Sequence, residues 1–280
     1  MAAMEASKLH NTVQRATRVM TLSWHGLNHL VWPAACANCG DRILEAGEGL
    51  CGRCWTQLLT CTAGDYCPRC GRDASRYGLV VGACAACRQE EIRFDGIARA
   101  GVYMEALQQM ILAFKHDRTE LAAVLAPLAD AALQGSCFYD DIELLIPVPQ
   151  HWTRRLLRGY NQSHLVAKRL KHPWARISTD LVRIRRTRAQ PVADTFPARA
   201  KNVDGAFAVR EDHPFSGKTV CLVDDIKTSG ATLNECARTL KEAGAARVYA
   251  LVLAVAGQRA RVQESKPVVV DESEMRGQHA

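Results

Sequence analysis

From about residue 94 onward, short continuous runs of apolar residues alternate with stripes in which apolar residues recur every three or four positions. A continuous run is typical of a strand buried on both faces of a parallel sheet, and a stripe is typical of an amphipathic helix. The runs predict strands at residues 97–103, 144–148, 180–184, 220–223 and 248–255, and the stripes predict helices at 107–114, 121–133, 161–170 and 233–243. Strands that alternate with helices indicate an α/β domain with a mostly parallel sheet.

The two ends of the chain follow other patterns. Residues 1–33 carry one apolar stripe, formed by Val13, Ala16, Met20, Trp24, Leu27 and Val31. The stripe predicts an amphipathic helix that either packs on the rest of the protein or lies on a membrane surface, and we favour the first role. There is no run of 18 apolar residues and no secretory signal, so we expect a cytoplasmic protein without membrane association. Residues 258–280 show no periodicity, and we expect disorder there.

Cysteine is unusually frequent, with 12 residues, and eight of them form four C-x-x-C pairs. The pairs are Cys36/Cys39, Cys51/Cys54, Cys67/Cys70 and Cys84/Cys87. Two such pairs place four thiolates around one tetrahedral ion, so the four pairs predict two structural Zn²⁺ ions. The segment has few large apolar residues, and the metal would therefore contribute directly to folding. Iron–sulfur ligation and redox dithiols are weaker alternatives, and the sequence leaves open which pairs share an ion.

Residues 220–232 combine a buried strand, two acids and a loop that suits a phosphate group. Asp224 and Asp225 follow the strand, at the end where open α/β sheets bind ligands. The next loop offers hydroxyl groups, and its glycine lets the backbone approach an anion just before a helix begins. The candidate loop residues are Thr228, Ser229, Gly230, Ala231 and Thr232. Taken alone, the two acids could merely cap a turn, and the loop could merely start a helix. Because the acids and the loop follow one another directly, we favour a binding site for a phosphorylated sugar.

At these residues the chain resembles the 5-phosphoribosyl-1-pyrophosphate (PRPP) motif of the type I phosphoribosyltransferases. In that family the paired acids hold the ribose hydroxyls and the loop holds the 5′-phosphate. The resemblance therefore implies that Asp224 and Asp225 bind the ribose of PRPP, that residues 228–232 bind its phosphate, and that Mg²⁺ accompanies the ligand.

The basic residues are concentrated in one part of the chain, which has a net charge of +7 overall. Between Arg154 and Arg210 there are 14 Lys or Arg residues and three acids, which indicates a polyanionic partner. The first basic cluster follows the strand at 144–148 and suits pyrophosphate, because guanidinium groups bind several negative charges at fixed geometry. Its candidate residues are Arg154, Arg155, Arg158 and Gly159. A second set, Arg188, Gln190 and Arg199, is typical of a loop that closes over a reaction centre. Solvated basic surfaces remain the alternative for both sets.

The order of several short motifs is similar to that of the ComF family, whose members include ComFC- and GntX-like proteins. The motifs are Trp32-Pro33, the tandem C-x-x-C pairs, Phe94-Asp95, Phe114-Lys115, Pro147-Val148-Pro149, Arg158-Gly159-Tyr160-Asn161-Gln162, Thr187/Gln190, Arg199/Asn202, Gly205-Ala206-Phe207 and the PRPP motif. The resemblance spans residues 30–257 and implies a double zinc ribbon (34–92) and a phosphoribosyltransferase-like domain (93–257). The patterns at the two ends of the chain add an amphipathic helical N-terminus (1–33) and a disordered tail (258–280). The segment from Pro191 to Pro197 departs from the family pattern between Gln190 and Arg199.

Two functional hypotheses follow from the motifs and the resemblance. In the first, the protein binds PRPP and transfers its phosphoribosyl group to an unknown acceptor, with release of pyrophosphate. In the second, it is a non-catalytic accessory protein of natural transformation that binds single-stranded DNA and meets other DNA-uptake proteins. The sequence identifies neither a catalytic acid or base nor an acceptor site.

Overall fold

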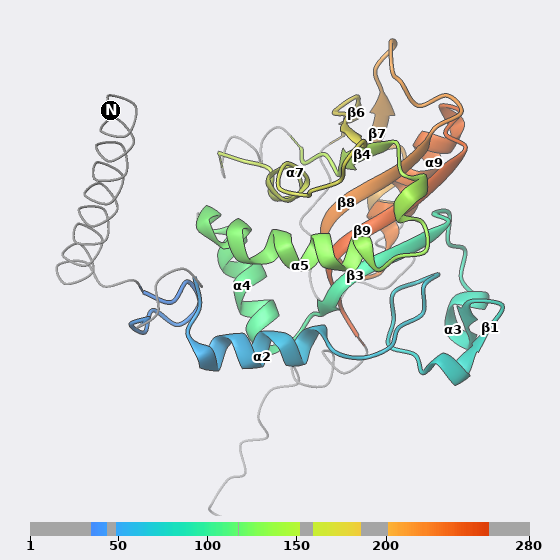
Figure 1. The fold of residues 1–280 in the computed structure, drawn as a ribbon. Coiled ribbons are helices and arrows are strands. Elements are labelled where there is room, and N and C mark those ends of the chain that lie inside the picture. Colours follow the sequence, from blue (N-terminus) through green and yellow to red (C-terminus); the bar gives the residue numbers. More distant parts are fainter. Residues whose placement is uncertain (1–34, 44–48, 117, 152–158, 186–200, 258–280) are drawn as a thin grey trace, which may run out of the picture. The chain divides into compact units, whose positions relative to one another are not determined.

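The computed structural model describes residues 35–43, 49–116, 118–151, 159–185 and 201–257 (Figure 1). The chain divides into two compact units, Met1–Gln57 and Leu58–Ala280. The predicted N-terminal helix and the predicted disordered tail lie outside the described residues, and the domain boundaries inferred from the sequence remain a prediction. Within the described part of the chain, no helix has the length and apolar character needed to span a membrane.

The second unit is built around a five-stranded sheet in which every neighbouring pair is parallel. The strand order is β3-β9-β8-β4-β5. The strands are β3 (Gly96–Val102), β4 (Leu144–Pro147), β5 (Arg176–Ile177), β8 (Thr219–Lys227) and β9 (Arg247–Val255). The parallel sheet predicted from the continuous apolar runs is therefore confirmed.

Helices cover both faces of this sheet (Figure 1). They are α4 (Glu105–Lys115), α5 (Ala122–Gln134), α7 (Gln162–Ala167) and α9 (Ala231–Glu242), with 3₁₀ turns η2 (Thr119–Leu121) and η3 (Tyr139–Asp141). On one face, Leu233 and Leu240 of α9 join a buried cluster with Leu222 and Val248. On the other face, α5 contacts β3 and β9. Because both faces are covered, the strands are apolar at nearly every position, which made them visible in the sequence.

Three details of the strand prediction need correction. The predicted strand at 180–184 is β6 (Leu181–Arg183), but it pairs antiparallel with β7 (Phe207–Val209) in a separate two-stranded sheet. The apolar pattern missed β7 and β5, because strands of two or three residues carry too few positions to show a period. The strand predicted at 220–223 continues as β8 through both acids to Lys227.

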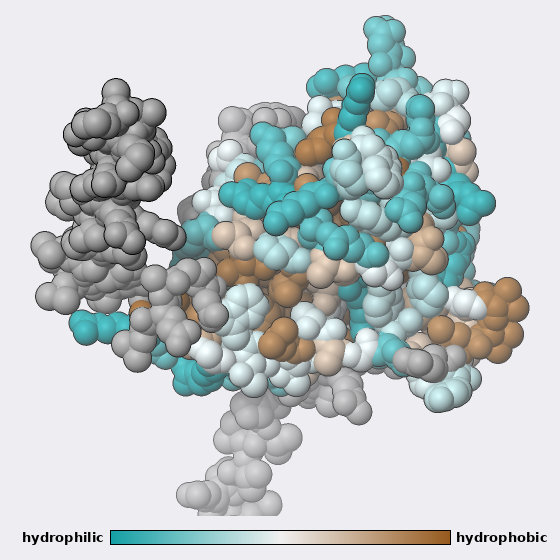
Figure 2. Space-filling view, in the orientation of Figure 1, coloured by the Kyte–Doolittle hydropathy of each residue, from teal (hydrophilic) through white to brown (hydrophobic). Residues whose placement is uncertain are grey.

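The second unit also contains a small cysteine-rich substructure. It follows α2 (Gly52–Thr62) and contains a 3₁₀ turn η1 (Arg76–Gly78), a hairpin of β1 (Leu79–Val80) and β2 (Ala83–Cys84), and helix α3 (Ala85–Arg88). The hairpin exposes large residues, with Val81 at its tip 99% exposed, and Figure 2 shows apolar surface gathered in this region. Some of the few large apolar residues of this substructure are therefore exposed and do not contribute to a hydrophobic core of its own.

One close backbone approach joins β3 to the last turn of α2. A Cβ atom added at Gly101 would lie 2.6 Å from the carbonyl oxygen of Cys61 and 2.8 Å from Cδ2 of Leu107. No side chain fits at such distances, so the sheet edge can approach Cys61 only because residue 101 is glycine.

We expect Gly101→Ala to lower the free energy of unfolding by about 2 kcal/mol or more, because a methyl group cannot enter this contact without backbone movement. Gly135→Ala is the matched control, since its added Cβ would meet its nearest neighbour at an ordinary 3.5 Å. Urea unfolding of both variants measures the effect, and equal stability of the two would contradict the predicted overlap.

Candidate functional site

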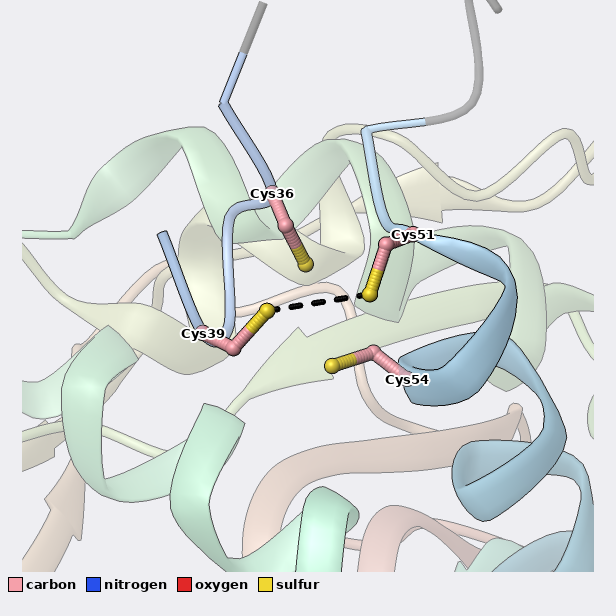
Figure 3. A group of neighbouring side chains, drawn as sticks. All are labelled: Cys36, Cys39, Cys51 and Cys54. Atoms are coloured by element: carbon pink, nitrogen blue, oxygen red, sulfur yellow. Dashed lines mark hydrogen bonds between the residues drawn. The ribbon is translucent and has the colours of Figure 1, made fainter. Parts of the chain in front are cut away.

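The eight paired cysteines form two separate groups, and pairs that are neighbours in sequence share a group. Their sulfur atoms lie within 4.8 Å of one another in each group. The first group, in the first unit, consists of Cys36, Cys39, Cys51 and Cys54 (Figure 3). The second group, in the second unit, consists of Cys67, Cys70, Cys84 and Cys87. This answers the question of pairing that the sequence left open.

The sulfur positions fit a tetrahedral zinc ion. Zn–S bonds of about 2.3 Å in a tetrahedron place sulfur atoms roughly 3.8 Å apart. The observed distances are 3.6 Å for Cys39–Cys51 and 3.5 Å for Cys67–Cys87. Polar hydrogens also point at the sulfurs, since the Cys84 amide donates to Cys67 Sγ at 3.3 Å. Contacts of this kind fix the ligands and favour the thiolate form, so both groups are suited to structural Zn²⁺.

The second cysteine group is part of the interior of the second unit. All four of its cysteines are buried, whereas Cys39 of the first group is exposed. Ile92 packs both against this group and against the main buried cluster of the sheet. We conclude that the second metal site supports the sheet as well as the ribbon around it.

Backbone and side-chain bonds tie the turn around Cys67 and Cys70 to β3. The Ile97 amide donates to the Pro68 carbonyl at 2.8 Å, and the Arg99 guanidinium donates to the Gly71 carbonyl at 2.7 Å. Arg99 is 5% exposed, pairs with the Asp73 carboxylate and lies over the ring of Tyr66. A buried arginine is stable only when its charge and donors are satisfied, and the zinc-binding turn supplies these partners.

The acid pair lies in the last part of β8, with a different partner for each carboxylate. Ser163 of α7 donates its hydroxyl to Asp224 Oδ1 at 3.2 Å, and the Asp225 amide donates to the same oxygen at 2.9 Å. Lys115, the last residue of α4, places its ammonium 2.9 Å from Asp225 Oδ2. The two acids are therefore compensated by a cation and by hydrogen bonds even without a ligand.

Asp224 is the most strongly perturbed acid of the site. Burial and the neighbouring Asp225 charge raise the pKa of Asp224 to about 7, although the Asp225 amide, Lys115 and Ser163 act in the opposite direction. A carboxyl group that changes charge near neutral pH can accept hydrogen bonds from hydroxyl groups or coordinate a cation once it ionises.

The predicted phosphate loop directly follows the acid pair. Gly230 is the N-cap of α9 with a left-handed φ of +82°, and a Cβ there would lie 3.0 Å from Cε of the buried Lys227. The left-handed conformation favours glycine, whereas the flexible Lys227 side chain could move away from an added Cβ atom. Ser229 accepts from the Ala231 amide, and no side chain at Gly230 caps the helix. The start of α9 therefore keeps backbone donors available for an anion.

Most of the predicted basic residues cannot be placed. Arg154, Arg155, Arg158, Arg188, Gln190 and Arg199 lie outside the described residues, and their roles remain predictions. Gly159 is exposed with a φ of +74°. The chain after it is well anchored, because the Tyr160 hydroxyl donates to the Phe114 carbonyl at 2.5 Å and Asn161 caps α7. Tyr160 thereby fixes the helix end that carries Lys115.

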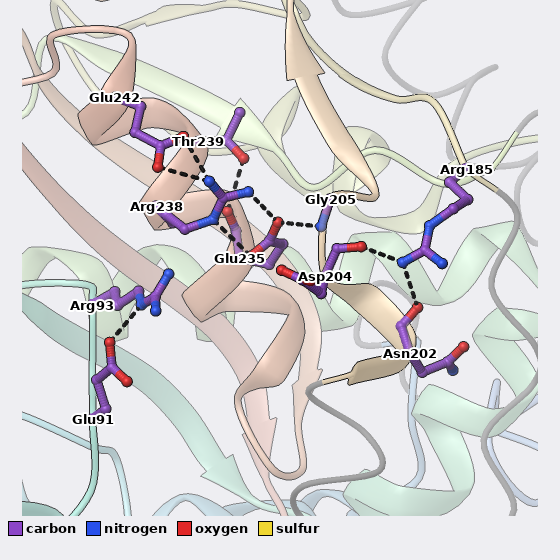
Figure 4. A network of polar contacts seen from close by, with 10 residues as sticks. All are labelled: Glu91, Arg93, Arg185, Asn202, Asp204, Gly205, Glu235, Arg238, Thr239 and Glu242. Atoms are coloured by element: carbon purple, nitrogen blue, oxygen red, sulfur yellow. Dashed lines mark hydrogen bonds and ion pairs between the residues drawn. The ribbon is translucent and has the colours of Figure 1, made fainter.

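The chain on both sides of residues 186–200 is held near α9 (Figure 4). The Gly205 amide donates to the buried carboxylate of Glu235 at 2.7 Å, and Arg238 donates to the same carboxylate. Arg185 donates to the carbonyl oxygens of Asn202 and Asp204. α9, which begins at the phosphate loop, thus bonds directly to the chain after residue 200, and Arg185 ties the chain before residue 186 to the same segment.

Sequence reasoning missed several polar groups of the site. Lys115 was visible only as part of a family motif, and Ser163 carried no signal at all, because its role depends on how α7 meets β8. At the base of the loop after β4, Gln150 donates to Gln162, while Gln150 Oε1 and Gln162 Nε2 are buried and have no partner among the described residues. Unpaired buried amide groups are costly and indicate a place where a polar ligand could bind.

Comparisons with known proteins agree with this architecture. The double zinc ribbon domain family matches residues 27–88, and the phosphoribosyl transferase domain family matches residues 163–280. Competence protein F of Haemophilus influenzae is 29% identical over 227 residues, covering 78% of this chain and 96% of that protein. DNA utilization protein YhgH of Escherichia coli K12 is 28% identical with the same coverage. Competence protein ComFC of Bacillus subtilis is 28% identical, covering 73% of this chain and 82% of that protein.

The parallel sheet, the acid pair before a phosphate loop and the two four-cysteine groups define a zinc-ribbon protein with a phosphoribosyltransferase domain. The relatives reported above are competence and DNA utilization proteins, and the similarity extends over most of their length. The chain therefore combines the two domains and has the relatives that the resemblance of its sequence motifs to the ComF family implied.

We expect the two metal groups to differ in their effect on the sheet. Cys39→Ser should lower the zinc content from two ions to one without exposing the β3 and β9 amides to hydrogen exchange. Cys70→Ser should remove the other ion and also expose those amides, because loss of a structural zinc removes folding free energy of several kcal/mol. Elemental analysis and hydrogen-exchange mass spectrometry measure both effects. Equal protection of β3 in the two variants would contradict the interior role of the second group.

Asp224→Asn should stabilise the protein at alkaline pH. The raised pKa of Asp224 contributes stability below its ordinary value of 3.8, and that contribution is lost as the pH rises through about 7. The variant avoids this loss and keeps an oxygen for the same donors. Its free energy of unfolding should therefore exceed that of the parent by roughly 1–3 kcal/mol at pH 8, with the difference shrinking toward pH 5.

Urea unfolding at pH 5, 6, 7 and 8 measures this difference. The exposed Asp140→Asn serves as the control and should show no pH-dependent gain. A difference between Asp224→Asn and the parent that stays constant from pH 5 to 8 would show that Asp224 does not titrate in this range.

Proposed function

We propose that this protein binds PRPP together with Mg²⁺ at the end of β8 and transfers the phosphoribosyl group of PRPP to an acceptor that the sequence does not identify. The observation that carries the proposal is the placement of Asp224 and Asp225 directly before a glycine-capped helix start. In this arrangement the acids can accept hydrogen bonds from vicinal ribose hydroxyls, while the backbone amides of residues 228–232 face the 5′-phosphate.

The present partners of the two carboxylates are a cation and hydrogen-bond donors, so a ligand that supplies hydroxyl donors and is accompanied by a cation could replace them. Asp225 is neutralised by Lys115 at 2.9 Å, and Asp224 receives two hydrogen bonds. Ribose hydroxyls would replace part of these donors. Mg²⁺, which prefers carboxylate and phosphate oxygens, would supply the charge needed for a pyrophosphate group to approach two acids.

The pyrophosphate end of PRPP would lie toward the loop after β4. Arg154, Arg155, Arg158 and Gly159 remain the candidates, and the unpaired amide atoms of Gln150 and Gln162 lie at the base of the same loop. Holding both ends of the substrate fixes the bond between C1′ and pyrophosphate. Transfer through an oxocarbenium-like state requires mainly such positioning and neutralisation of the leaving group.

A second candidate function rests on the names of the relatives, which are competence and DNA utilization proteins. We propose as the alternative that the protein binds single-stranded DNA without catalysis and acts beside DNA-uptake proteins. The excess of basic residues between Arg154 and Arg210 supports it. We also infer a cytoplasmic location, because none of the 12 cysteines forms a disulfide and free thiols suit a reducing compartment.

Calorimetric titration of the zinc-loaded protein with PRPP should show saturable binding in the presence of Mg²⁺. Asp225→Asn should weaken it at least about tenfold, because a ribose acceptor and a metal ligand are lost together. The exposed Asp141→Asn is the matched control and should bind like the parent.

Unchanged PRPP affinity in Asp225→Asn would refute the proposal. The alternative is tested by titrating oligothymidylate at 20 mM and 200 mM salt, where phosphate contacts predict binding that weakens steeply with salt. Absence of binding at the lower salt concentration would exclude it.

A further inference from the structure

A cavity of about 610 Å³ lies at the opposite end of the sheet from the acid pair. Its walls include Leu144, the first residue of β4, and Lys218, which directly precedes β8. Lys218 and Asp225 are seven residue steps apart, or about 23 Å along the strand. The cavity is therefore distinct from the site proposed for PRPP, and its volume is within the usual range for small-molecule sites.

One wall of the cavity is an indole ring held in a fixed position. Trp174 is 53% exposed, and its ring meets His172 edge-on at a centroid distance of 5.1 Å. The Ala175 amide donates to His172 Nδ1 at 3.1 Å, so Nε2 carries the proton and donates to the Tyr139 carbonyl at 3.0 Å. Both ring nitrogens of His172 are thus engaged, and the imidazole supports the tryptophan rigidly while half of the indole faces solvent.

The polar part of the cavity has one cation without a counterion. Lys218 is paired with Glu143 at 2.7 Å, and the Asp180 carboxylate accepts from the Ser178 hydroxyl at 2.8 Å. Arg176 also lines the cavity and is exposed, and within the described ranges its guanidinium has neither an ion pair nor a hydrogen bond. Since the acids are occupied, the group that remains available is a guanidinium two residues from the indole.

A half-exposed indole beside a free guanidinium matches the two parts of a nucleotide. We propose that this cavity binds a nucleoside phosphate, with the base stacked on Trp174 and the phosphate bound by Arg176. An added peptide strand fits less well, because β5 is only two residues long and offers few ladder bonds. The base and phosphate belong either to a free nucleotide or to one unit of a strand, and both present the same chemistry to these residues.

Titrations of the zinc-loaded full chain with AMP, GMP and dTMP test the proposal, followed by calorimetry and tryptophan fluorescence. At least one nucleotide should saturate the site. The matching nucleoside, which lacks the phosphate, and ribose 5-phosphate, which lacks the base, should each bind at least about tenfold more weakly. Equal affinity for a nucleotide and for ribose 5-phosphate would overturn the assignment of the indole wall.

Substitutions locate the binding. Trp174→Leu and Arg176→Ala should each weaken nucleotide binding about tenfold or more. Tyr77→Leu, which changes an aromatic residue of η1 that is 93% exposed, and Arg169→Ala, which removes another exposed arginine, are the matched controls and should bind like the parent. Trp174→Phe keeps a stacking surface and should retain most of the affinity, which guards against a folding defect in Trp174→Leu.

Two further measurements distinguish a nucleic-acid strand from a free nucleotide, and this cavity from the site proposed for PRPP. Oligothymidylate that binds at least about tenfold more tightly than dTMP, with the same loss in Trp174→Leu, identifies a strand, whereas equal affinities identify a free nucleotide. Asp225→Asn should leave nucleotide binding unchanged even if PRPP binding is lost. Absence of saturable binding, unchanged binding in both Trp174→Leu and Arg176→Ala, or loss of binding in Asp225→Asn would each overturn the proposal.

Discussion

Two adjacent carboxylates at the end of a buried strand have to be compensated, and much of the second unit is arranged to do so. β8 lies between β4 and β9 and is inaccessible over its apolar half, so Asp224 and Asp225 meet the ends of α4 and α7 rather than bulk water. α4 supplies the ammonium of Lys115, and α7 supplies the hydroxyl of Ser163. Ligand hydroxyl groups and a bound cation could replace part of these interactions with the two carboxylates. The need to stabilise two buried acids therefore also creates a place where a ligand can bind.

The zinc-binding segment and the sheet are physically connected in the second unit. A ribbon with few large apolar residues cannot fold on hydrophobic burial alone, and its thiolate groups require a metal. The second group adds to this a buried arginine, Arg99, whose partners all belong to the ribbon. The sheet edge at β3 would be left with an uncompensated charge if the ribbon turn were lost. The second ribbon and the sheet therefore depend on one another.

The two ends of the parallel sheet present different chemistry. At the carboxyl ends of the strands there are acids and a glycine-capped helix start, which suit a phosphorylated sugar. At the amino end there is a supported indole with a free guanidinium, which suits an aromatic base with a phosphate. A protein with both sites could respond to a sugar phosphate and to a nucleotide at the same time, without either ligand blocking the other.

The sequence by itself determined the elements whose signal is local. Continuous apolar runs identified β3, β4, β8 and β9 because these strands are buried on both faces, and the spacing of the cysteines identified the metal ligands because two thiols three residues apart can share one ion. The acid pair and the phosphate loop were recognisable because all their residues are consecutive. In contrast, the tertiary structure alone decided which C-x-x-C pairs share a group, that β6 pairs with β7 outside the main sheet, and that Lys115 and Ser163 complete the acid pair. These contacts join residues that are far apart in sequence and carry no local pattern, so they exist only after the helices have packed on the sheet.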